Sequence, residues 1–267
     1  MTPLERISVS FGLENEMTTN NGYKDIFDVR GKSYNLAAEL CPEARSLERQ
    51  LLLDLLLPEP GERIIDAPAG GGYLADALSS LGAKPLCLEP SEQFAAGLSS
   101  DYQIAIAPMT DMPFVDGYAD KLGSLAGLHH LSHSERRCVF SEAFRVLKPG
   151  GVIAVADVLA DTKIASFLNG PVDRYTSTGH DGLFFSDGEF SDLFASAGFK
   201  VASEQYHEFA WSFPDEATMV HFMTQIFGLT KACPDTVYRE VTNSLDVRAD
   251  ATGVHVGWGL LYAHAVK

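Results

Sequence analysis

Cysteine, long apolar runs and basic residues are all scarce in this chain. Its four cysteines in 267 residues are widely spaced, with no C-x-x-C pair, so we expect neither a disulfide framework nor a zinc site built on cysteine. No run of eighteen apolar residues occurs, and residues 1–12 lack the basic-then-apolar order of a signal peptide. These absences predict a cytoplasmic protein without membrane contact.

The scarcity of positive charge limits the classes of molecule that the protein can bind. Lys and Arg number 20 against 36 Asp and Glu, which gives a net charge of -16 and a pI near 4.8. A nucleic-acid partner would require a basic track that neutralises phosphates, and none is visible. We therefore expect a small-molecule substrate that is neutral or cationic, and no nucleic acid. The oligomeric state is left open, a homodimer being one option.

The most informative stretch is residues 63–91. Ile64 and Ile65 form a short apolar run, three glycines follow at 70–72, and apolar residues then recur at helical spacing up to Leu81. This order predicts a strand, a tight loop and a helix whose N-terminal N–H groups point at a ligand. A second apolar run ends in Glu89, where such a unit places an acid for ribose hydroxyls.

Asp66 separates two cofactor classes that fit this outline. Gly70, Gly72 and Ala75 satisfy the G-x-G-x-x-[G/A] pattern of dinucleotide sites, which is a weak signal alone. A carboxylate at Asp66 would repel a diphosphate beside the strand end, whereas it complements the ammonium and sulfonium of S-adenosylmethionine. A nicotinamide-dependent oxidoreductase stays open as an alternative.

At these residues the sequence resembles the class I S-adenosylmethionine-dependent methyltransferases. Their first motif is usually an acid, two small residues and G-x-G, which Asp66, Gly70 and Gly72 match, while Pro68 and Ala69 replace a more frequent Gly-Cys. A second match is an apolar strand at 122–128 that ends in His129 and His130, followed by a helix, Leu-Lys-Pro-Gly-Gly and another apolar strand at 152–158.

The resemblance implies roles for particular residues. Asp66, Gly70 and Gly72 would hold the methionine part of the cofactor, Glu89 the ribose and Asp111 with Met112 the adenine, while Arg30 would hold the carboxylate and Tyr34 would lie near the methyl donor. The complete set of expected cofactor-binding residues is Arg30, Tyr34, Asp66, Ala67, Pro68, Gly70, Gly72, Glu89, Pro90, Asp111, Met112 and Leu128.

Histidines supply the candidate catalytic bases, because imidazole titrates near neutral pH. His129 and His130 follow the fourth strand, and His180 lies in a polar, glycine-rich segment at 161–188 that is long enough for a substrate lid. A metal site formed by His129, His130 and His133 is not expected, since adjacent residues rarely converge on one ion and no carboxylate supports them. We therefore assign no metal.

The whole pattern predicts one doubly wound, Rossmann-like α/β domain with a seven-stranded sheet, mostly parallel with an antiparallel edge strand, plus helical cap elements. Residues 1–57 would form an arm and cap helices, 61–213 the core, 214–250 a helical insertion and 251–267 the closing strand. The predicted function is methyl transfer from S-adenosylmethionine to O, N or C of a small biosynthetic metabolite. A non-catalytic scaffold of the same fold is the remaining alternative.

Overall fold

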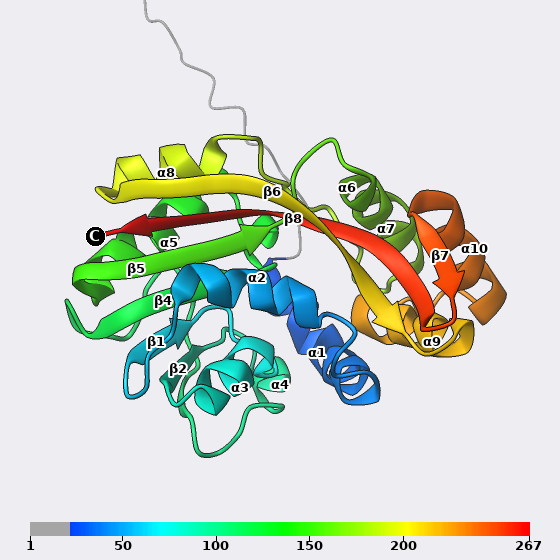
Figure 1. Cartoon of the computed structure of the whole chain (residues 1–267), viewed down its shortest axis with the longest axis horizontal. Helices are drawn as coiled ribbons and strands as arrows, with labels where there is room; N and C mark the ends of the chain where they lie inside the picture. Colours follow the sequence, from blue (N-terminus) through cyan, green and yellow to red (C-terminus); the bar gives the residue numbers. More distant parts are fainter. Residues whose placement is uncertain (1–21) are drawn as a thin grey trace, which may run out of the picture.

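The computed structural model describes residues 22–267, so residues 1–21 of the predicted arm lie outside the described part. Eight strands form one sheet, in the order β3-β2-β1-β4-β5-β8-β6, with β7 paired to β8 (Figure 1). The strands are β1 (Arg63–Asp66), β2 (Lys84–Leu88), β3 (Gln103–Ala105), β4 (Ala119–Leu125), β5 (Leu147–Asp157), β6 (Lys200–Phe213), β7 (Val247–Asp250) and β8 (Gly253–Val266).

Helices surround the sheet on both faces and at one end. They are α1 (Tyr23–Leu40), α2 (Ser46–Leu56), α3 (Tyr73–Ser80), α4 (Glu92–Ala95), α5 (His133–Val146), α6 (Lys163–Phe167), α7 (Asp173–Tyr175), α8 (Glu189–Ala197), α9 (Glu216–Phe227) and α10 (Pro234–Ser244), with a 3-10 helix η1 (Leu128–His130) and a π-helix η2 (Leu168–Val172). Among residues 22–267, no helix combines the length and apolar character that crossing a bilayer requires.

The predicted α/β fold is confirmed. The first five strands pair in parallel, and β8 runs antiparallel between β5 and β6. Ile64 and Ile65 of β1 are both fully buried but belong to opposite cores, because successive strand residues face opposite sides of a sheet. The eighth strand, β7, is a short addition to β8 that the sequence analysis did not predict.

Two layers of helices cover the parallel part of the sheet. Leu52 and Leu56 of α2 join Leu74 of α3 in one core, while Phe140 of α5 and Phe194 of α8 belong to the other. The predicted capping box starts α5, since the Ser132 side chain accepts from the Glu135 N–H and Glu135 returns a bond to the Ser132 N–H.

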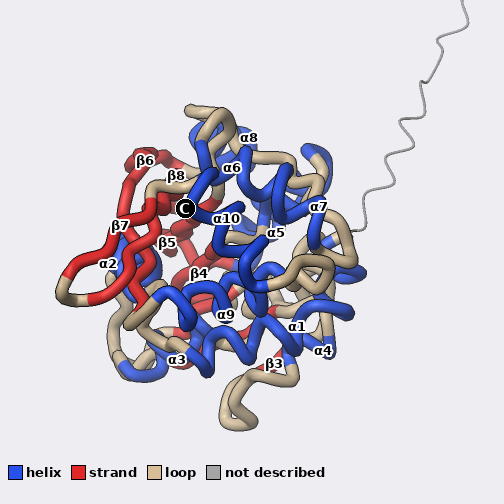
Figure 2. The backbone as a smooth tube through the Cα atoms, turned by 90° about the vertical axis from the view of Figure 1, so that its right-hand side faces the viewer, coloured by secondary structure: helices blue, strands red, loops and turns tan. Residues whose placement is uncertain are grey.

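The long strands β6 and β8 carry the chain beyond the parallel sheet to a cap. There α9 and α10 of residues 214–250 pack on each other, with α10 against α6 and α9 against α1, and Figure 2 views the molecule from this end. The segment 161–188, expected as a long loop, begins instead with α6, η2 and α7, because Thr162 caps α6 by accepting from the Ala165 N–H. The cap and α1 thus stand at the carboxyl ends of the parallel strands.

Candidate active site

The glycine loop between β1 and α3 forms one wall of a small cavity, here called the loop cavity. Asp66 ends β1, is 1% exposed, and its Oδ2 accepts from the Ala75 N–H in the first turn of α3 at 3.0 Å. Burial raises the pKa of Asp66 well above its usual range, and the nearby Glu89 and Asp76 raise it further. A carboxylate in this position is stabilised by a positive ligand group.

Glu89, just beyond β2, is fully buried beside this loop. Its Oε2 accepts from the Gly70 N–H and the Tyr23 hydroxyl, both at 2.9 Å, and its Oε1 accepts from the Ser91 N–H at 2.9 Å. Burial raises the pKa of Glu89 to about 7, although these donors oppose the shift. Two buried carboxyl groups, Asp66 and Glu89, therefore flank the glycine loop.

Helix α1 lies closely over the glycine loop. A Cβ atom built on Gly71 would come within 1.9 Å of the Asn35 side chain, and one on Gly70 within 2.7 Å of the Phe94 ring. Phe94 stacks on Phe27 of α1 with a centroid distance of 4.6 Å. As a result the loop cavity, lined by Asp66, Gly70 and Phe94 among others, has a volume of only about 50 Å³.

A second cavity of about 50 Å³, here called the histidine cavity, adjoins the first through Phe27, Tyr34, Arg45 and Ala126, which line both. His129 lies in η1 after β4, and its Nδ1 is 2.6 Å from Oδ1 of Asp157 at the end of β5. Burial acts to raise the pKa of Asp157, but the His129 ring and the Val158 N–H outweigh it, so the net shift is downward. This carboxylate fixes the orientation of the imidazole.

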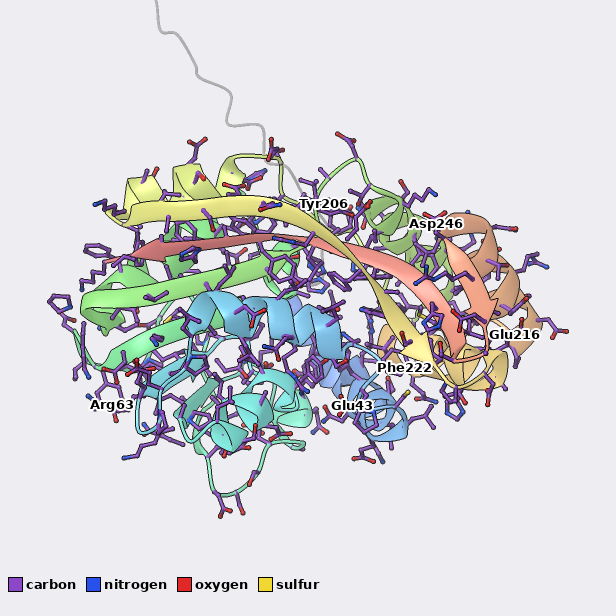
Figure 3. The ribbon with its side chains drawn as sticks, in the orientation of Figure 1. Glu43, Arg63, Tyr206, Glu216, Phe222 and Asp246 are labelled. Carbon is purple, nitrogen blue, oxygen red and sulfur yellow. The ribbon has the colours of Figure 1, made fainter. Side chains whose placement is uncertain are left out.

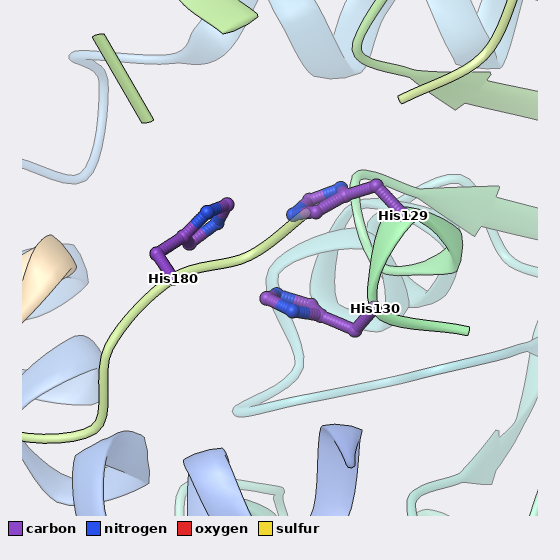
Figure 4. A group of neighbouring side chains, drawn as sticks. All are labelled: His129, His130 and His180. Atoms are coloured by element: carbon purple, nitrogen blue, oxygen red, sulfur yellow. The ribbon is translucent and has the colours of Figure 1, made fainter. Parts of the chain in front are cut away.

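His180 faces the same cavity from the segment after α7. Its Nδ1 is 2.9 Å from Oδ1 of Asn169 in η2. The rings of His129, His130 and His180 lie together, with centroids 4.2 to 5.5 Å apart (Figure 4). Burial lowers the pKa of His130 and of His180 well below the usual value, and the other cationic groups, including Arg30, lower them further.

Arg30 of α1 is a buried guanidinium in the histidine cavity. It is 4% exposed, and its Nη2 donates to the Ile226 carbonyl at 3.0 Å, whereas Nε and Nη1 have no hydrogen-bond partner. Burial lowers the pKa of Arg30 to about 10. An arginine with two unpaired buried donors is costly unless an anionic group meets it.

The remaining predicted residues occupy different surroundings. Tyr34 is half-buried between the two cavities, and its hydroxyl accepts from Arg45. Pro68 lines the loop cavity, Gly72 is the N-cap residue just before α3 with φ +100°, and Asp111 is exposed. Of the others, Ala67, Met112 and Leu128 are buried and Pro90 is half-buried.

Sequence reasoning missed the residues whose role depends on distant partners. Arg45 of the α1–α2 connection pairs with Glu48, which also accepts from the Trp211 indole at 2.8 Å, between the two cavities. His133, which the sequence places next to the histidine pair, is exposed on α5, and its Nδ1 lies 3.7 Å from Glu189. His180 takes its place in the cluster because the chain folds back after α7, which no local pattern reveals.

A much larger groove of the described structure lies elsewhere. It has a volume of about 1150 Å³ and is lined by residues in or beside β6, β8, α2, α6 and β7, among them Glu43, Tyr206 and Asp246, which Figure 3 labels. Among the groups that line it are an exposed ion pair, Lys163 with Asp246, and the imidazole of His255. Because Asp66, Glu89 and the histidine cluster are absent from it, the two small joined cavities are the better candidate site.

A family model described as a methyltransferase domain matches residues 65–155, which run from β1 to β5 and include Asp66, the glycine loop, Glu89 and His129. Residues 65–155 therefore form a methyltransferase domain of the class I, S-adenosylmethionine-dependent type. The family cofactor fits the residues present, since the glycine loop admits close approach and the acidic pair suits a cationic ligand with ribose hydroxyls.

The relatives and structural neighbours of this chain are distant. An uncharacterized methyltransferase of Synechocystis is 31% identical over 115 residues, 41% of this chain and 53% of the relative, so the chain matches about half the length of that relative. An S-adenosylmethionine-dependent Diels-Alderase of Neonectria is 28% identical over 169 residues, 59% of this chain and 67% of the relative. A methyltransferase structure from Thermotoga maritima, with 20% identity and TM-score 0.60, covers 91% of this chain and 98% of that one.

Proposed function

We propose that this protein transfers the methyl group of S-adenosylmethionine to a small metabolite bound in the histidine cavity. The supporting observation is the junction of the two cavities. Asp66 lines one, with Glu89 hydrogen-bonded to its glycine loop, an imidazole cluster lines the other, and four residues line both. When bound, the cofactor supplies a methyl group on a positively charged sulfur. Alignment of the acceptor and exclusion of water are then the tasks of the protein.

On the loop side, Asp66 accepts from the cofactor's ammonium group and Glu89 from its ribose hydroxyls. Gly70 and Gly72 allow the backbone to approach the methionine part. Pro68 lines the loop cavity, and Ala67, Pro90 and Leu128, which do not line it, would reach the cofactor when the cavity opens. Asp111 with Met112 meets the adenine. Arg45, at the junction of the two cavities, would neutralise the methionine carboxylate in place of the predicted Arg30, which lines only the histidine cavity.

Binding requires α1 to move outward. Ligand sites in proteins usually have volumes of about 300 to 1,000 Å³, whereas each cavity here has about 50 Å³. Tyr23, Phe27 and Asn35 of α1 contact Glu89, Phe94 and the glycine loop, so a displacement of this helix opens both cavities together. Helix α1 therefore serves as the lid over the cofactor.

On the histidine side, His129, His130 or His180 accepts the proton of the acceptor. The lowered pKa of His130 and His180 keeps these rings neutral near pH 7, as a proton acceptor must be. The unpaired Arg30 guanidinium supplies a local positive charge, which favours an acceptor with an anionic or strongly accepting group in place of the neutral or cationic molecule expected from the net charge. The composition also supports a cytoplasmic reaction without nucleic acid.

A second candidate is a pericyclic or other non-methylating reaction on the same scaffold, because the Neonectria relative is named a Diels-Alderase. Calorimetric titration with S-adenosylhomocysteine and with NADH tests the cofactor. We expect heat with the former only, and heat with NADH alone would favour an oxidoreductase. Incubation of metabolite extracts with isotopically methyl-labelled S-adenosylmethionine tests the transfer, and cofactor binding without any labelled product would favour the second candidate.

A further inference from the structure

We propose that His129, His130 and His180 bind a divalent transition-metal ion at the wall of the histidine cavity. Each ring offers one nitrogen, and these three nitrogens lie within 4.8 Å of one another. All three residues line the histidine cavity, so a metal held by them has an open side toward a bound molecule. Three histidines with an open fourth position are a catalytic zinc arrangement.

The hydrogen bonds of two histidines fix the tautomer that a metal requires. Nδ1 of His129 faces the carboxylate of Asp157 at 2.6 Å, so it carries the proton and leaves the Nε2 lone pair for coordination. The Asn169 Nδ2 donates to the Gly182 carbonyl, so its Oδ1 is the acceptor that faces His180 Nδ1 at 2.9 Å. Metal-ligating histidines generally donate their second N–H to a carboxylate or carbonyl oxygen in this way.

The segments that carry the three rings are tied together. The Leu183 N–H donates to the His129 carbonyl at 2.8 Å, the Gly182 N–H to Asn169 at 2.8 Å, and the His180 N–H to Asp173 at 2.8 Å. Asn169 belongs to a π-helix, a rare geometry that is frequent at functional sites. His130 is held by the edges of Tyr23 and Phe27, with centroid distances of 5.9 and 5.6 Å.

Ligand chemistry selects the class of metal. Imidazole nitrogen suits zinc, iron, copper and nickel, whereas magnesium and calcium prefer oxygen ligands. Tetrahedral zinc with bonds of 2.0 to 2.1 Å places its nitrogens about 3.4 Å apart, so the rings must close by roughly an ångström through side-chain rotation. The adjacency of His129 and His130, which argues against a site in the sequence, is overcome here because η1 brings their ring centroids within 4.2 Å.

The charge balance indicates what the metal would bind. Asp157 offsets part of the metal charge, but Arg30 adds another positive charge to the same cavity, so an anionic ligand is required. If the proposed methyl transfer holds, metal-bound hydroxide replaces a free histidine as the base, and the acceptor is an oxygen or sulfur acid. The hydroxide takes the acceptor proton, leaving water and a metal-bound acceptor anion as the nucleophile. Arg30 would hold a second anionic group of that acceptor.

Titration of the full-length, tag-free, chelator-treated protein with zinc tests the site, and cobalt serves as the spectroscopic probe. We expect one equivalent to bind, a visible d–d spectrum of four-coordinate cobalt, and no binding of magnesium at the same concentration. His130→Ala and His180→Ala should lower zinc affinity by more than about 100-fold, and Asn169→Ala, which releases the His180 ring, by about 10- to 100-fold. His133→Ala and His221→Ala, both exposed, are the matched controls and should bind as wild type.

Absence of one-equivalent binding, or equal binding by His180→Ala and His221→Ala, would overturn the metal site. Circular dichroism and S-adenosylhomocysteine affinity establish that the variants remain folded, since the cofactor residues Asp66 and Glu89 are not altered. Zinc binding without cofactor binding would retain the metal site and reject the proposed function. Cofactor binding without zinc binding would retain the proposed function and reject the metal site.

Discussion

The two adjoining cavities differ in charge although they share part of their walls. The loop cavity is lined by Asp66, and Glu89 lies behind its glycine loop, where it accepts from the Gly70 N–H; both buried carboxyl groups have a raised pKa. The histidine cavity contains imidazoles with a lowered pKa and the unpaired guanidinium of Arg30. Each set of groups is unfavourable to bury alone, which indicates that the first cavity is built for a positive ligand and the second for a negative one.

Two buried arginines differ in whether their charge has a partner, and this difference separates a residue that stabilises the fold from one that is available to a ligand. Arg136 is also fully buried, but its Nη1 pairs with Glu189 at 2.7 Å and its guanidinium lies 3.8 Å from the Phe185 ring centroid. Arg30 has no ion pair among the described residues. A buried charge without a partner detracts from stability and is retained where function requires it.

The largest expected effect is therefore a difference in the free energy of unfolding between variants of Arg136 and of Arg30. Arg136→Met should lower the free energy of unfolding by about 3 kcal/mol, because it breaks a buried ion pair. Arg30→Met should leave stability unchanged or raise it by up to about 1 kcal/mol, because it removes two unsatisfied donors. Urea denaturation of both variants measures the difference. Equal losses would mean that Arg30 is a structural residue and that the histidine cavity is not adapted to an anion.

The second-largest expected effect is on ligand affinity, when the negative charge of Asp66 is removed from the loop cavity. Asp66→Ala should weaken S-adenosylhomocysteine binding by about 10- to 150-fold, which corresponds to the roughly 1.5 to 3 kcal/mol of a charge-assisted hydrogen bond. Calorimetry measures this affinity, and Asp54→Asn on the exposed side of α2 is the matched control. A loss within about threefold would show that Asp66 does not meet the ammonium group, and the contrast between the cavities would lose its functional meaning.

Those parts of the fold and of the candidate site that rest on a contiguous stretch of sequence could be predicted, whereas contacts between distant segments could not. The β1–α3 unit, with Asp66, the glycine loop and Glu89, is contiguous in sequence, and its strand, loop and helix formed where the spacing placed them. The bounds of α1 could not be predicted, because Gly31 and polar residues interrupt its apolar stripe, although Gly31 is needed where Phe94 approaches closely. The His180–Asn169 and Tyr23–Glu89 contacts join separate segments, so no pattern in either segment could reveal them.

The pH should change both the stability of the protein and its affinity for S-adenosylhomocysteine, because Glu89 titrates near neutrality. Its folded pKa of about 7 lies above its usual value, so the native state binds a proton more tightly, and the stability that Glu89 contributes falls as pH rises from about 4.5 to 7. Ribose hydroxyls need the ionised form, so S-adenosylhomocysteine affinity should increase up to about tenfold per pH unit below 7 and level off above it.

Calorimetry between pH 6 and pH 8 checks this dependence. Glu89→Gln should bind weakly with a flat profile, and Asp66→Asn should keep the slope at lower affinity, which separates the two acids. A wild-type affinity that is constant over this range would contradict ionisation of Glu89 on binding and leave Asp66 as the charge that distinguishes the loop cavity.

The smallest expected effect concerns the lid. The Tyr23 hydroxyl occupies an oxygen of Glu89 that the ribose would use, so Tyr23→Phe should remove a competitor and tighten S-adenosylhomocysteine binding about 2- to 10-fold, the equivalent of one net hydrogen bond. Tyr238→Phe, which removes an exposed Tyr–Glu hydrogen bond of 3.1 Å, is the control and should change nothing. Weaker binding by Tyr23→Phe would mean that Tyr23 contacts the ligand directly, so that α1 completes the loop cavity when it closes and does not merely obstruct it.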